Sequence, residues 1–268
     1  MKEMPWIADR RRMDYLDWDV GRDSLCENDA GAGPAMELME VPRAARPVPL
    51  HQILDEAMTI KETSFFRDSV PFELLRDKLL PELIRSNAEE RKLRLWSAAC
   101  STGQETYSLA MLLLEHFPQL ADWDVTILGT DVSQAACDAA RLGRYSKLEV
   151  KRGLPIGLLL RYFEPDGEEW KVRDRLRRMV RFERANLCEP LPAGLRAGWM
   201  KFDVVLLRNV LLYFAAEERA RVLLEVHARI QAKGALLLGT AEQAEDSTDL
   251  FRVELEGGCY FYRPLVVE

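Results

Sequence analysis

A turn of small and polar residues in the first half of the chain has the composition of a nucleoside-binding loop. Ala99-Cys100-Ser101-Thr102-Gly103 follows a short apolar run, and Gln104 and Glu105 open a stretch with an apolar helical face. Small side chains let backbone N–H groups and a helix N-terminus approach a ligand closely. A carboxylate, Asp131, ends the next apolar run, Val125 to Thr130. Because neighbouring parallel strands end at one edge of a sheet, the two features suggest a nucleoside bound across that edge.

Each feature also has an interpretation that needs no ligand. Thr102 and Glu105 have the spacing of a capping box, in which both side chains bind N–H groups at a helix start. Asp131 has the residue type and position of an N-cap for the helix that begins at Val132 to Gln134. The loop holds Gly103 alone and lacks the G-x-G-x-x-G pattern, so an NAD-dependent enzyme ranks last among the functions considered.

Length and composition predict an ordinary folded chain. Its 268 residues are 48% hydrophobic and 30% charged, with a formal net charge of −7, which disfavours a general nucleic-acid binder. No run of about 18 apolar residues and no apolar N-terminal segment is present, so we expect a cytoplasmic protein without membrane insertion. Five widely spaced cysteines without a C-x-x-C pair and three scattered histidines favour reduced thiols and disfavour a metal centre.

The elements that must position the loop follow from composition and periodicity. Residues 1–50 are rich in Asp, Arg, Gly, Ala and Pro, and we expect a mobile arm. Residues 51–90 form a helical lead-in, with helices expected at 50–58 and 71–84. Residues 91–268 alternate between strand and helix. The expected strands are 93–99, 125–130, 202–207, 235–238, 250–254 and 259–263, and the expected helices are 104–116, 133–142 and 217–231.

A section at about 146–185 interrupts this alternation. Asp166-Gly167 lies between Arg161–Phe163 and Trp170–Val172, which is typical of a β-hairpin, and Val180–Phe182 is predicted to be a further strand. The expected fold is therefore α/β, with a mostly parallel sheet that ends in an antiparallel C-terminal hairpin and carries a small inserted β-subdomain.

One segment opposes the sign of the net charge. Between Lys171 and Arg184 stand seven Lys and Arg residues against Asp174 and Glu183. A solvated face of the hairpin is the default interpretation, and a docking surface for an acidic protein is the alternative.

Blocks of sequence at compatible spacings extend the signal over about residues 53–263. They are Ala57 to Asp68, Trp96 to Glu105, Gly129 to Asp131, Arg152 to Pro155, Phe182 with Asn186-Leu187, Phe202 to Phe214, Lys233-Gly234 and Leu238 to Glu242. In these blocks the chain resembles the CheR-type chemotaxis receptor methyltransferases. The resemblance implies a Rossmann-like fold that binds S-adenosylmethionine, methylates glutamates on cytoplasmic helices of chemoreceptors and releases S-adenosylhomocysteine. An ionised carboxylate needs no general base, which agrees with the lack of a His–Asp or Cys–His arrangement.

The resemblance also implies roles for individual residues. Thr63 and Arg67 are expected near the methionine end of the cofactor, with Arg67 close to the methyl group. Glu105 is expected to meet the α-amino group, and Asp131 to accept hydrogen bonds from the ribose hydroxyls. An ion pair with an acidic neighbour on an exposed helix is the alternative for Arg67.

Further residues follow in the later blocks. The resemblance implies that Asn186 and Leu187 lie beside the adenine, that Arg208 and Asn209 lie at the next strand end, and that Tyr213 lines the transfer site. Asn186 also suits the start of a turn, and Tyr213 also suits a core aromatic with its hydroxyl at the rim.

The chain departs from the family at its N-terminal end. Lys61 stands where the family usually carries Asn. Residues 1–50 have 7 Lys and Arg against 10 Asp and Glu and show no pattern that matches the family's basic helix. The short hairpin loop leaves capture of a receptor peptide by strand addition open. Two alternative functions are a non-catalytic module that binds the cofactor or its product, and a methyltransferase with a substrate other than a receptor.

Overall fold

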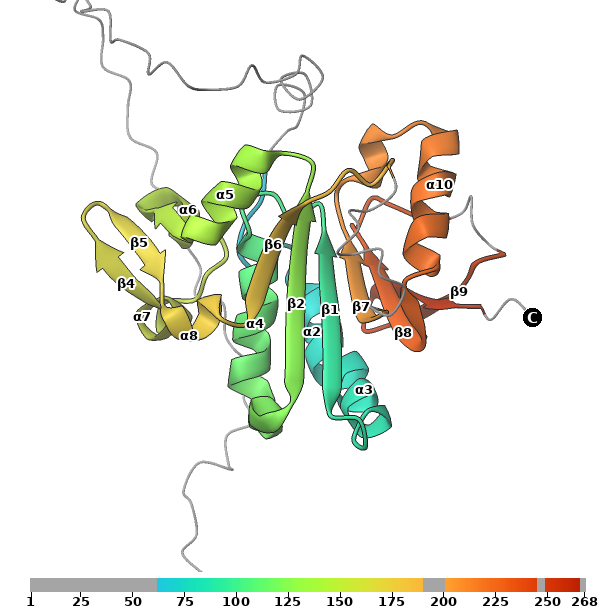
Figure 1. Cartoon of the computed structure of the whole chain (residues 1–268), viewed down its shortest axis with the longest axis horizontal. Coiled ribbons are helices and arrows are strands. Elements are labelled where there is room, and N and C mark those ends of the chain that lie inside the picture. Colours follow the sequence, from blue (N-terminus) through green and yellow to red (C-terminus); the bar gives the residue numbers. More distant parts are fainter. Residues whose placement is uncertain (1–61, 190–200, 245–248, 266–268) are drawn as a thin grey trace, which may run out of the picture. The chain divides into compact units, whose positions relative to one another are not determined.

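Seven strands form the central sheet, in the spatial order β6-β2-β1-β7-β8-β10-β9 (Figure 1). Its parallel strands are β1 (Lys92–Ala98), β2 (Asp124–Asp131), β6 (Val180–Arg184), β7 (Phe202–Leu207) and β8 (Ile230–Leu238). Two antiparallel strands, β9 (Phe251–Glu256) and β10 (Cys259–Pro264), close the far edge. The expected α/β fold with an antiparallel C-terminal hairpin is confirmed.

The computed structural model describes residues 62–189, 201–244 and 249–265. The expected arm at 1–50, the expected helix at 50–58 and Lys61 lie outside these residues. Within the described part of the chain, no helix is long and apolar enough to cross a membrane.

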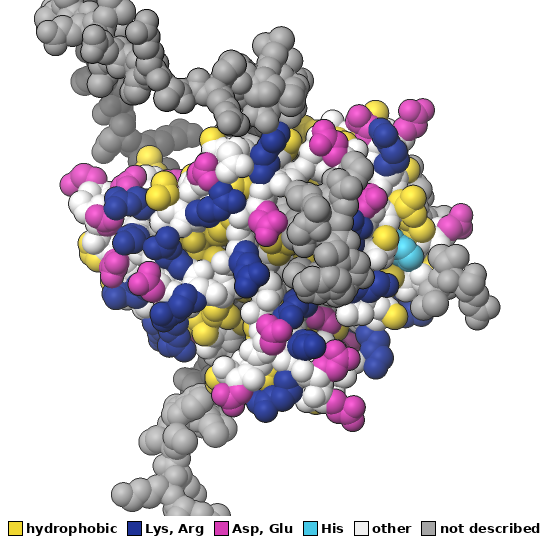
Figure 2. Space-filling model, viewed as in Figure 1, with side chains coloured by type: hydrophobic (Ala, Val, Ile, Leu, Met, Phe, Trp, Pro, Cys, Tyr) yellow, Lys and Arg dark blue, Asp and Glu magenta, His cyan; other side chains and the backbone are white. Residues whose placement is uncertain are grey.

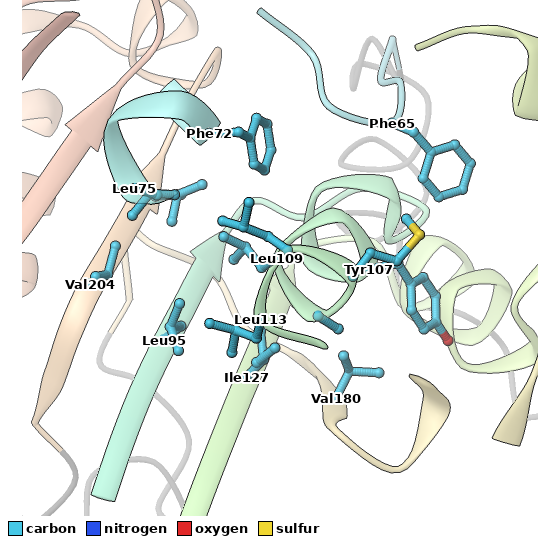
Figure 3. Packing of buried hydrophobic residues seen from close by; sticks show 14 of the residues in the cluster. Phe65, Phe72, Leu75, Leu95, Tyr107, Leu109, Leu113, Ile127, Val180 and Val204 are labelled. Carbon is cyan, nitrogen blue, oxygen red and sulfur yellow. The ribbon is translucent and has the colours of Figure 1, made fainter. Parts of the chain in front are cut away.

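One face of the sheet packs against the helices that precede β1 and follow it. The predicted helix at 71–84 is found as α2 (Ser69–Leu74), a π-helical turn (Leu75–Leu79) and α3 (Leu80–Ser86), and the helix at 104–116 is α4 (Gln104–His116). Figure 3 shows Leu109 and Leu113 of α4 against Leu95 and Ile127 of the sheet; all four side chains are buried.

The opposite face packs against α10 (Ala216–His227). Side chains alternate between the faces along a strand, so Leu93 and Leu95 join the first core and Trp96 and Ala98 join this one. The second core is completed by Val222 and other apolar residues of α10. This two-sided burial explains why the central strand β7 is buried along its whole length.

The boundary between α10 and β8 differs from the expectation. The helix ends at His227 rather than 231, and the strand begins at Ile230 rather than 235. Ile230 pairs with Phe202, whose N–H donates to Arg229 O at 2.7 Å. Pairing with β7 therefore takes over residues whose helical periodicity continues that of α10.

The inserted subdomain is a second sheet in the order β3-β5-β4 with three short helices. Its elements are β3 (Arg144–Ser146), α6 (Lys147–Lys151), α7 (Ile156–Tyr162), β4 (Phe163–Asp166), β5 (Glu169–Val172) and α8 (Asp174–Arg177). The predicted hairpin is present, but its turn lies at Gly167-Glu168, one residue later than predicted, because Asp166 still pairs with Glu169 and ends β4. Arg161 and Tyr162, expected in a strand, end α7, because Leu159 and Tyr162 are buried at helical spacing.

The strand predicted at Val180–Phe182 is β6, which belongs to the main sheet and pairs in parallel with β2. The inserted strands therefore end before the boundary at 185 that the sequence suggests. The connection into the main sheet runs from α5 (Gln134–Leu142), which follows β2, through the subdomain and back to β6.

Register brings three strand ends to one level. Ala98 of β1 pairs with Thr130 of β2 and with Leu207 of β7. The residues that follow are Ala99, Asp131 and Arg208, so the three loops that carry them leave the sheet side by side. In Figure 1 this is the end to which the arrowheads of β1 and β2 point.

Candidate functional site

The loop after β1 is a tight turn in unusual backbone conformations. Ala99, Ser101 and Gly103 have φ values of 64°, 50° and 95°. A side chain at Gly103 would place its Cβ 2.8 Å from the Cβ of Ala140, so glycine is required there for space as well as for φ. Left-handed conformations at non-glycine residues cost free energy and cluster at ligand sites.

Asp131 ties this loop to the end of β2. Its Oδ2 accepts from the backbone N–H of Ser101 at 2.8 Å and its Oδ1 accepts from that of Ser133 at 3.0 Å. The N-cap of α5 is Ser133, whose Oγ accepts from Ala136 N at 3.1 Å, so the interpretation of Asp131 as the N-cap is wrong. Asp131 therefore joins the loop after β1 to the turn before α5.

Glu105 takes no part in a capping box. The N-cap of α4 is Gly103, without a side-chain cap, and Thr102 Oγ1 donates to Gln104 Oε1 at 2.8 Å. The carboxylate of Glu105 accepts from Ser97 Oγ at 2.7 Å and from Arg208 Nη1 at 2.9 Å. Glu105 therefore faces the strand ends rather than its own helix start.

Arg208 is the buried charge that connects these segments. Its side chain is 1% exposed, and besides Glu105 it binds Arg67 O at 2.8 Å and Asp68 Oδ2 at 2.9 Å, both through Nη2. Its guanidinium also lies over the ring of Phe72, 5.8 Å from the centroid. The fork geometry of arginine suits this role, and two carboxylates offset the cost of burying the charge.

Arg67 and Tyr213 come from different segments and line the same cavity. Arg67 Nη1 donates to Glu62 O at 2.7 Å, and the neighbouring Asp68 pairs with Arg208 instead. Tyr213 lies in a 3-10 helix, η3 (Leu211–Tyr213), and is 54% exposed, so the alternative of a core aromatic is wrong.

Glu242 holds the segment that carries Tyr213, and the sequence pattern assigned it no role beyond membership of a block. Its Oε1 accepts from the N–H groups of Val210 and Leu211, and its Oε2 from those of Asn209 and Gly239, all four at 2.7 Å. Asn209 has a φ of 59°. A carboxylate that is only 7% exposed thus fixes a strained turn between the ends of β7 and β8. The sequence signal that could have pointed to this role is a glutamate that closely follows an apolar strand.

Seven of the predicted site residues line one cavity at the strand ends. They are Thr63, Arg67, Glu105, Asp131, Arg208, Asn209 and Tyr213. Asn186 and Leu187 do not line this cavity. Asn186 follows β6, and its Oδ1 accepts from Cys188 N at 3.0 Å, which is the turn that its residue type favours.

Carboxylates dominate the charge of the cavity. Glu62, Glu105 and Asp131 line it with Arg67 and Arg208, and Arg208 is already paired to Glu105. Burial raises the pKa of the Cys100 thiol well above its ordinary value, and the Cys137 thiol and the Asp131 carboxylate add to the shift. Cys100 is therefore a neutral thiol at physiological pH and not a nucleophile. Carboxylate acceptors beside a narrow backbone loop suit a nucleoside with a cationic tail, so the residues fit S-adenosylmethionine.

Comparison with known proteins finds a matching family model and several relatives. The family model "CheR methyltransferase, SAM binding domain" matches residues 61–256. Chemotaxis protein methyltransferase 1 of Pseudomonas aeruginosa is 41% identical over 209 residues, which cover 76% of this chain and 74% of that protein. Chemotaxis protein methyltransferase 1 of Vibrio cholerae is 41% identical, with 74% and 70% covered. A solved TehB-like S-adenosylmethionine-dependent methyltransferase from Corynebacterium glutamicum is 13% identical, with 70% and 86% covered and a TM-score of 0.38.

Proposed function

Since the chain belongs to the CheR methyltransferase family, and is thus an S-adenosylmethionine-dependent methyltransferase of chemotaxis signalling, we propose that it methylates glutamate side chains of chemoreceptors. The acceptors are glutamates on the receptors' cytoplasmic helices, and the enzyme acts in the cytoplasm. Each transfer yields a glutamyl methyl ester and removes one negative charge from the receptor.

The observation that carries this proposal is a cavity that combines carboxylates and arginines able to position reactants. Among the described residues that line it there is no histidine, and the thiol of Cys100 stays protonated. A glutamate carboxylate is ionised near pH 7 and attacks without a general base. Positioning alone is worth about 7–11 kcal/mol when the geometry is right. The cavity therefore supports a substrate that is already a nucleophile.

The cofactor, when bound, supplies a methyl group on a sulfonium centre that an ionised carboxylate can accept. Within the proposal, Asp131 holds the ribose hydroxyls, Glu105 the amino group, and Thr63 the same methionine end. Arg67 and Tyr213 position the transferred group and the incoming carboxylate. The bond from Arg67 to Glu62 O fixes the guanidinium, which limits how tightly it pairs with the substrate carboxylate.

The adenine is assigned to Asn186 and Leu187 on indirect support. Both residues follow β6, whose Arg184 pairs with Asp131 in the sheet, so they extend the same edge. Arg208 and Asn209 contribute to the cofactor site at the end of β7. There the guanidinium of Arg208 binds the carboxylate of Glu105, so the two residues act on the cofactor together.

A methyl-transfer assay tests the proposal. Full-length protein, S-adenosylmethionine labelled in its methyl group, and purified cytoplasmic fragments of the source organism's chemoreceptors are incubated, and the label on protein is measured before and after mild alkali. We expect label on glutamates that alkali releases as methanol. Calorimetric binding of S-adenosylhomocysteine without any transfer to receptors would contradict the enzyme and favour a non-catalytic module. Alkali-stable label would contradict the ester.

A further inference from the structure

A groove lined by arginines lies beside the edge strand of the main sheet. Arg141 from α5, Arg177 and Arg178 at the end of α8, and Arg181 of β6 line it, with Asp174 as the acidic residue of the lining. Figure 2 shows Lys and Arg side chains gathered on this side of the described residues, over α8 and β6. The groove contains the centre of the basic segment 171–184, which the cofactor site does not use.

The four arginines differ in how they are held. Arg141 Nε donates to Phe182 O at 3.1 Å, and Arg177 Nη2 donates to Arg141 O at 3.0 Å, so these two are fixed to the backbone. Arg178 and Arg181 are exposed, and neither forms an ion pair within the described part of the chain. The groove thus combines a fixed wall with two arginines that are available to a partner.

Charge and residue type indicate a partner that carries carboxylates. The segment 171–184 has seven basic residues against two acidic ones, in a chain whose net charge is −7. Like charges gathered at one place repel each other, and an acidic partner relieves that repulsion. Six of the seven are arginines, whose planar fork binds carboxylates in bidentate fashion.

We propose that this groove docks the acidic helical surface of the protein substrate and so presents its glutamates to the cofactor cavity. The inference rests on the proposed function, because a protein methylated on glutamates must present clustered carboxylates. It assigns to the edge of the sheet a recognition role for which the sequence of residues 1–50 shows no basic helical pattern.

The spacing within the sheet allows one substrate to reach both places. Arg181 lies three residues before Arg184, which pairs with Asp131, so the groove lies about 10 Å along the strand from the cavity's edge. β6 and β1 are separated by β2, which adds about 10 Å across the sheet. The diagonal of these two distances is about 14 Å. A helix rises about 1.5 Å per residue, so about ten residues of a helical substrate span it.

The floor of the groove disfavours a single-stranded nucleic acid. Its aromatic members, Tyr107 and Phe182, are 1% and 6% exposed. Proteins that bind single strands stack bases on exposed aromatic rings, and these two rings are covered. A partner recognised by its carboxylates therefore fits the groove better.

Charge reversal tests the proposal in the full-length protein. The variant combines Arg178→Glu with Arg181→Glu, and a matched control combines Arg85→Glu with Lys233→Glu, which are also exposed and lie outside the groove. For the receptor fragment we expect KM to rise tenfold or more in the groove variant, with kcat and the affinity for S-adenosylhomocysteine within twofold of wild type. The control stays within twofold throughout. Raising the salt from about 50 to about 300 mM raises KM for wild type but hardly for the groove variant.

Two further measurements separate the docking proposal from the proposed function. Calorimetry of the receptor fragment against wild type and variant, without methyl donor, reports docking alone. Ester formation with an unchanged KM in the groove variant overturns the docking surface and leaves the methyltransferase. Charge-dependent docking without ester formation overturns the proposed glutamate methylation and leaves the docking surface. An oligonucleotide that binds wild type near physiological salt and loses affinity only in the groove variant, with receptor docking unaffected, overturns the acidic-protein partner in favour of a nucleic acid.

Discussion

Arg208 and Glu242 connect the segments that form the cofactor cavity, and Arg208 also lines it. Arg208 joins the carboxylates of Glu105 and Asp68, and Glu242 gathers four backbone N–H groups from the ends of β7 and β8. Charge-assisted hydrogen bonds in buried surroundings are stronger than neutral ones and leave costly gaps when one partner is removed. The two residues therefore act on the site through the loops that they hold.

Replacing Glu242 with Gln tests this role. Whichever way the amide turns, its NH2 group faces two backbone N–H donors, so two buried hydrogen bonds are lost and the turn at Asn209 is released. We expect a loss of about 2–5 kcal/mol in the free energy of unfolding, measured with urea, and a fall in turnover from displacement of Tyr213. Glu89→Gln, at an exposed glutamate, is the control. Equal stability of the two variants would show that the clamp is dispensable.

Arg67→Ala addresses the transfer site. The side chain is partly exposed and, among the described residues, makes one hydrogen bond, to Glu62 O, so we expect little stability to depend on it. We expect kcat to fall at least tenfold, which corresponds to about 1.4 kcal/mol, while the midpoint of thermal unfolding stays close to wild type. Steady-state methylation and a thermal melt measure the two effects. Unchanged turnover would remove Arg67 from the transfer site.

At single positions the sequence predicted which residues gather but not how they are held. Asp131 and Glu105 each had two interpretations, ligand binding and helix capping. Their contacts contradict the capping interpretation of both. Glu242 was hidden because hydrogen bonds from a side chain to a distant backbone leave no periodic pattern. Asn186 makes the turn that its residue type favours, and its role toward the adenine stays a proposal.

Among the elements, the parallel strands do the positioning by ending at one level. Ala98 of β1 pairs with a residue of β2 on one side and of β7 on the other. The residues that follow the three pairing positions, Ala99, Asp131 and Arg208, therefore lie next to one another at the sheet edge. Gly129 of β2 leaves room for two neighbouring side chains. A Cβ there would lie 2.6 Å from Cδ1 of Phe182 and 2.8 Å from Oγ1 of Thr106. The ring of Phe182 on β6 thus packs directly against the backbone of β2.

Gly129→Ala is expected to overpack this contact. The ring of Phe182 must shift, with a loss of about 1–3 kcal/mol in the free energy of unfolding. The matched control is Gly157→Ala in α7, where nothing lies within 4 Å of the added methyl, and there we expect a gain of about 0.5–1 kcal/mol from helix propensity. Chemical denaturation measures both. A loss at Gly157 as large as that at Gly129 would refute the packing explanation.

Strands and helices with strong periodicity were predictable from the sequence, and the subdomain was predictable only in part. Buried runs such as Phe202–Leu207 have one interpretation, whereas Arg161 and Tyr162 combine strand-like residues with a helical burial pattern that only packing decides. The end of α10 was set by pairing of Ile230 with Phe202, a contact between residues 28 positions apart. Local preference carries no information on such pairings.

At the scale of the described molecule, Glu115 connects helix α4 of the main domain to helix α7 of the inserted subdomain. Its carboxylate accepts from the hydroxyl of Tyr162 at 2.5 Å and pairs with Arg161, both on α7. Burial alone would raise the pKa of Glu115, but the hydrogen bonds from Tyr162 and Arg161 outweigh it and lower the pKa below 4.5. The same contact raises the pKa of Tyr162 to about 12, with burial as the larger cause.

This link predicts a dependence of stability on pH. A carboxylate whose folded pKa is lowered contributes stability above its unfolded pKa, near 4.5, and loses it as the pH falls through the lower, folded value. Between pH 4.5 and that lower value we expect the free energy of unfolding to fall less steeply in Glu115→Gln than in wild type. Urea titrations at several pH values measure the slopes, with Glu89→Gln as control. Identical slopes would show that the link does not titrate.

The most direct test of the account is calorimetric titration of S-adenosylhomocysteine into full-length wild type and Asp131→Asn. In the proposed site, one product molecule lies in the cavity at the strand ends, with Asp131 as its ribose acceptor. We expect one molecule bound per chain by wild type and a weakening of about 1–3 kcal/mol in the variant, through lost charge-assisted hydrogen bonds, with both proteins folded. Equal affinity in the two proteins, or no binding by folded wild type, would contradict it.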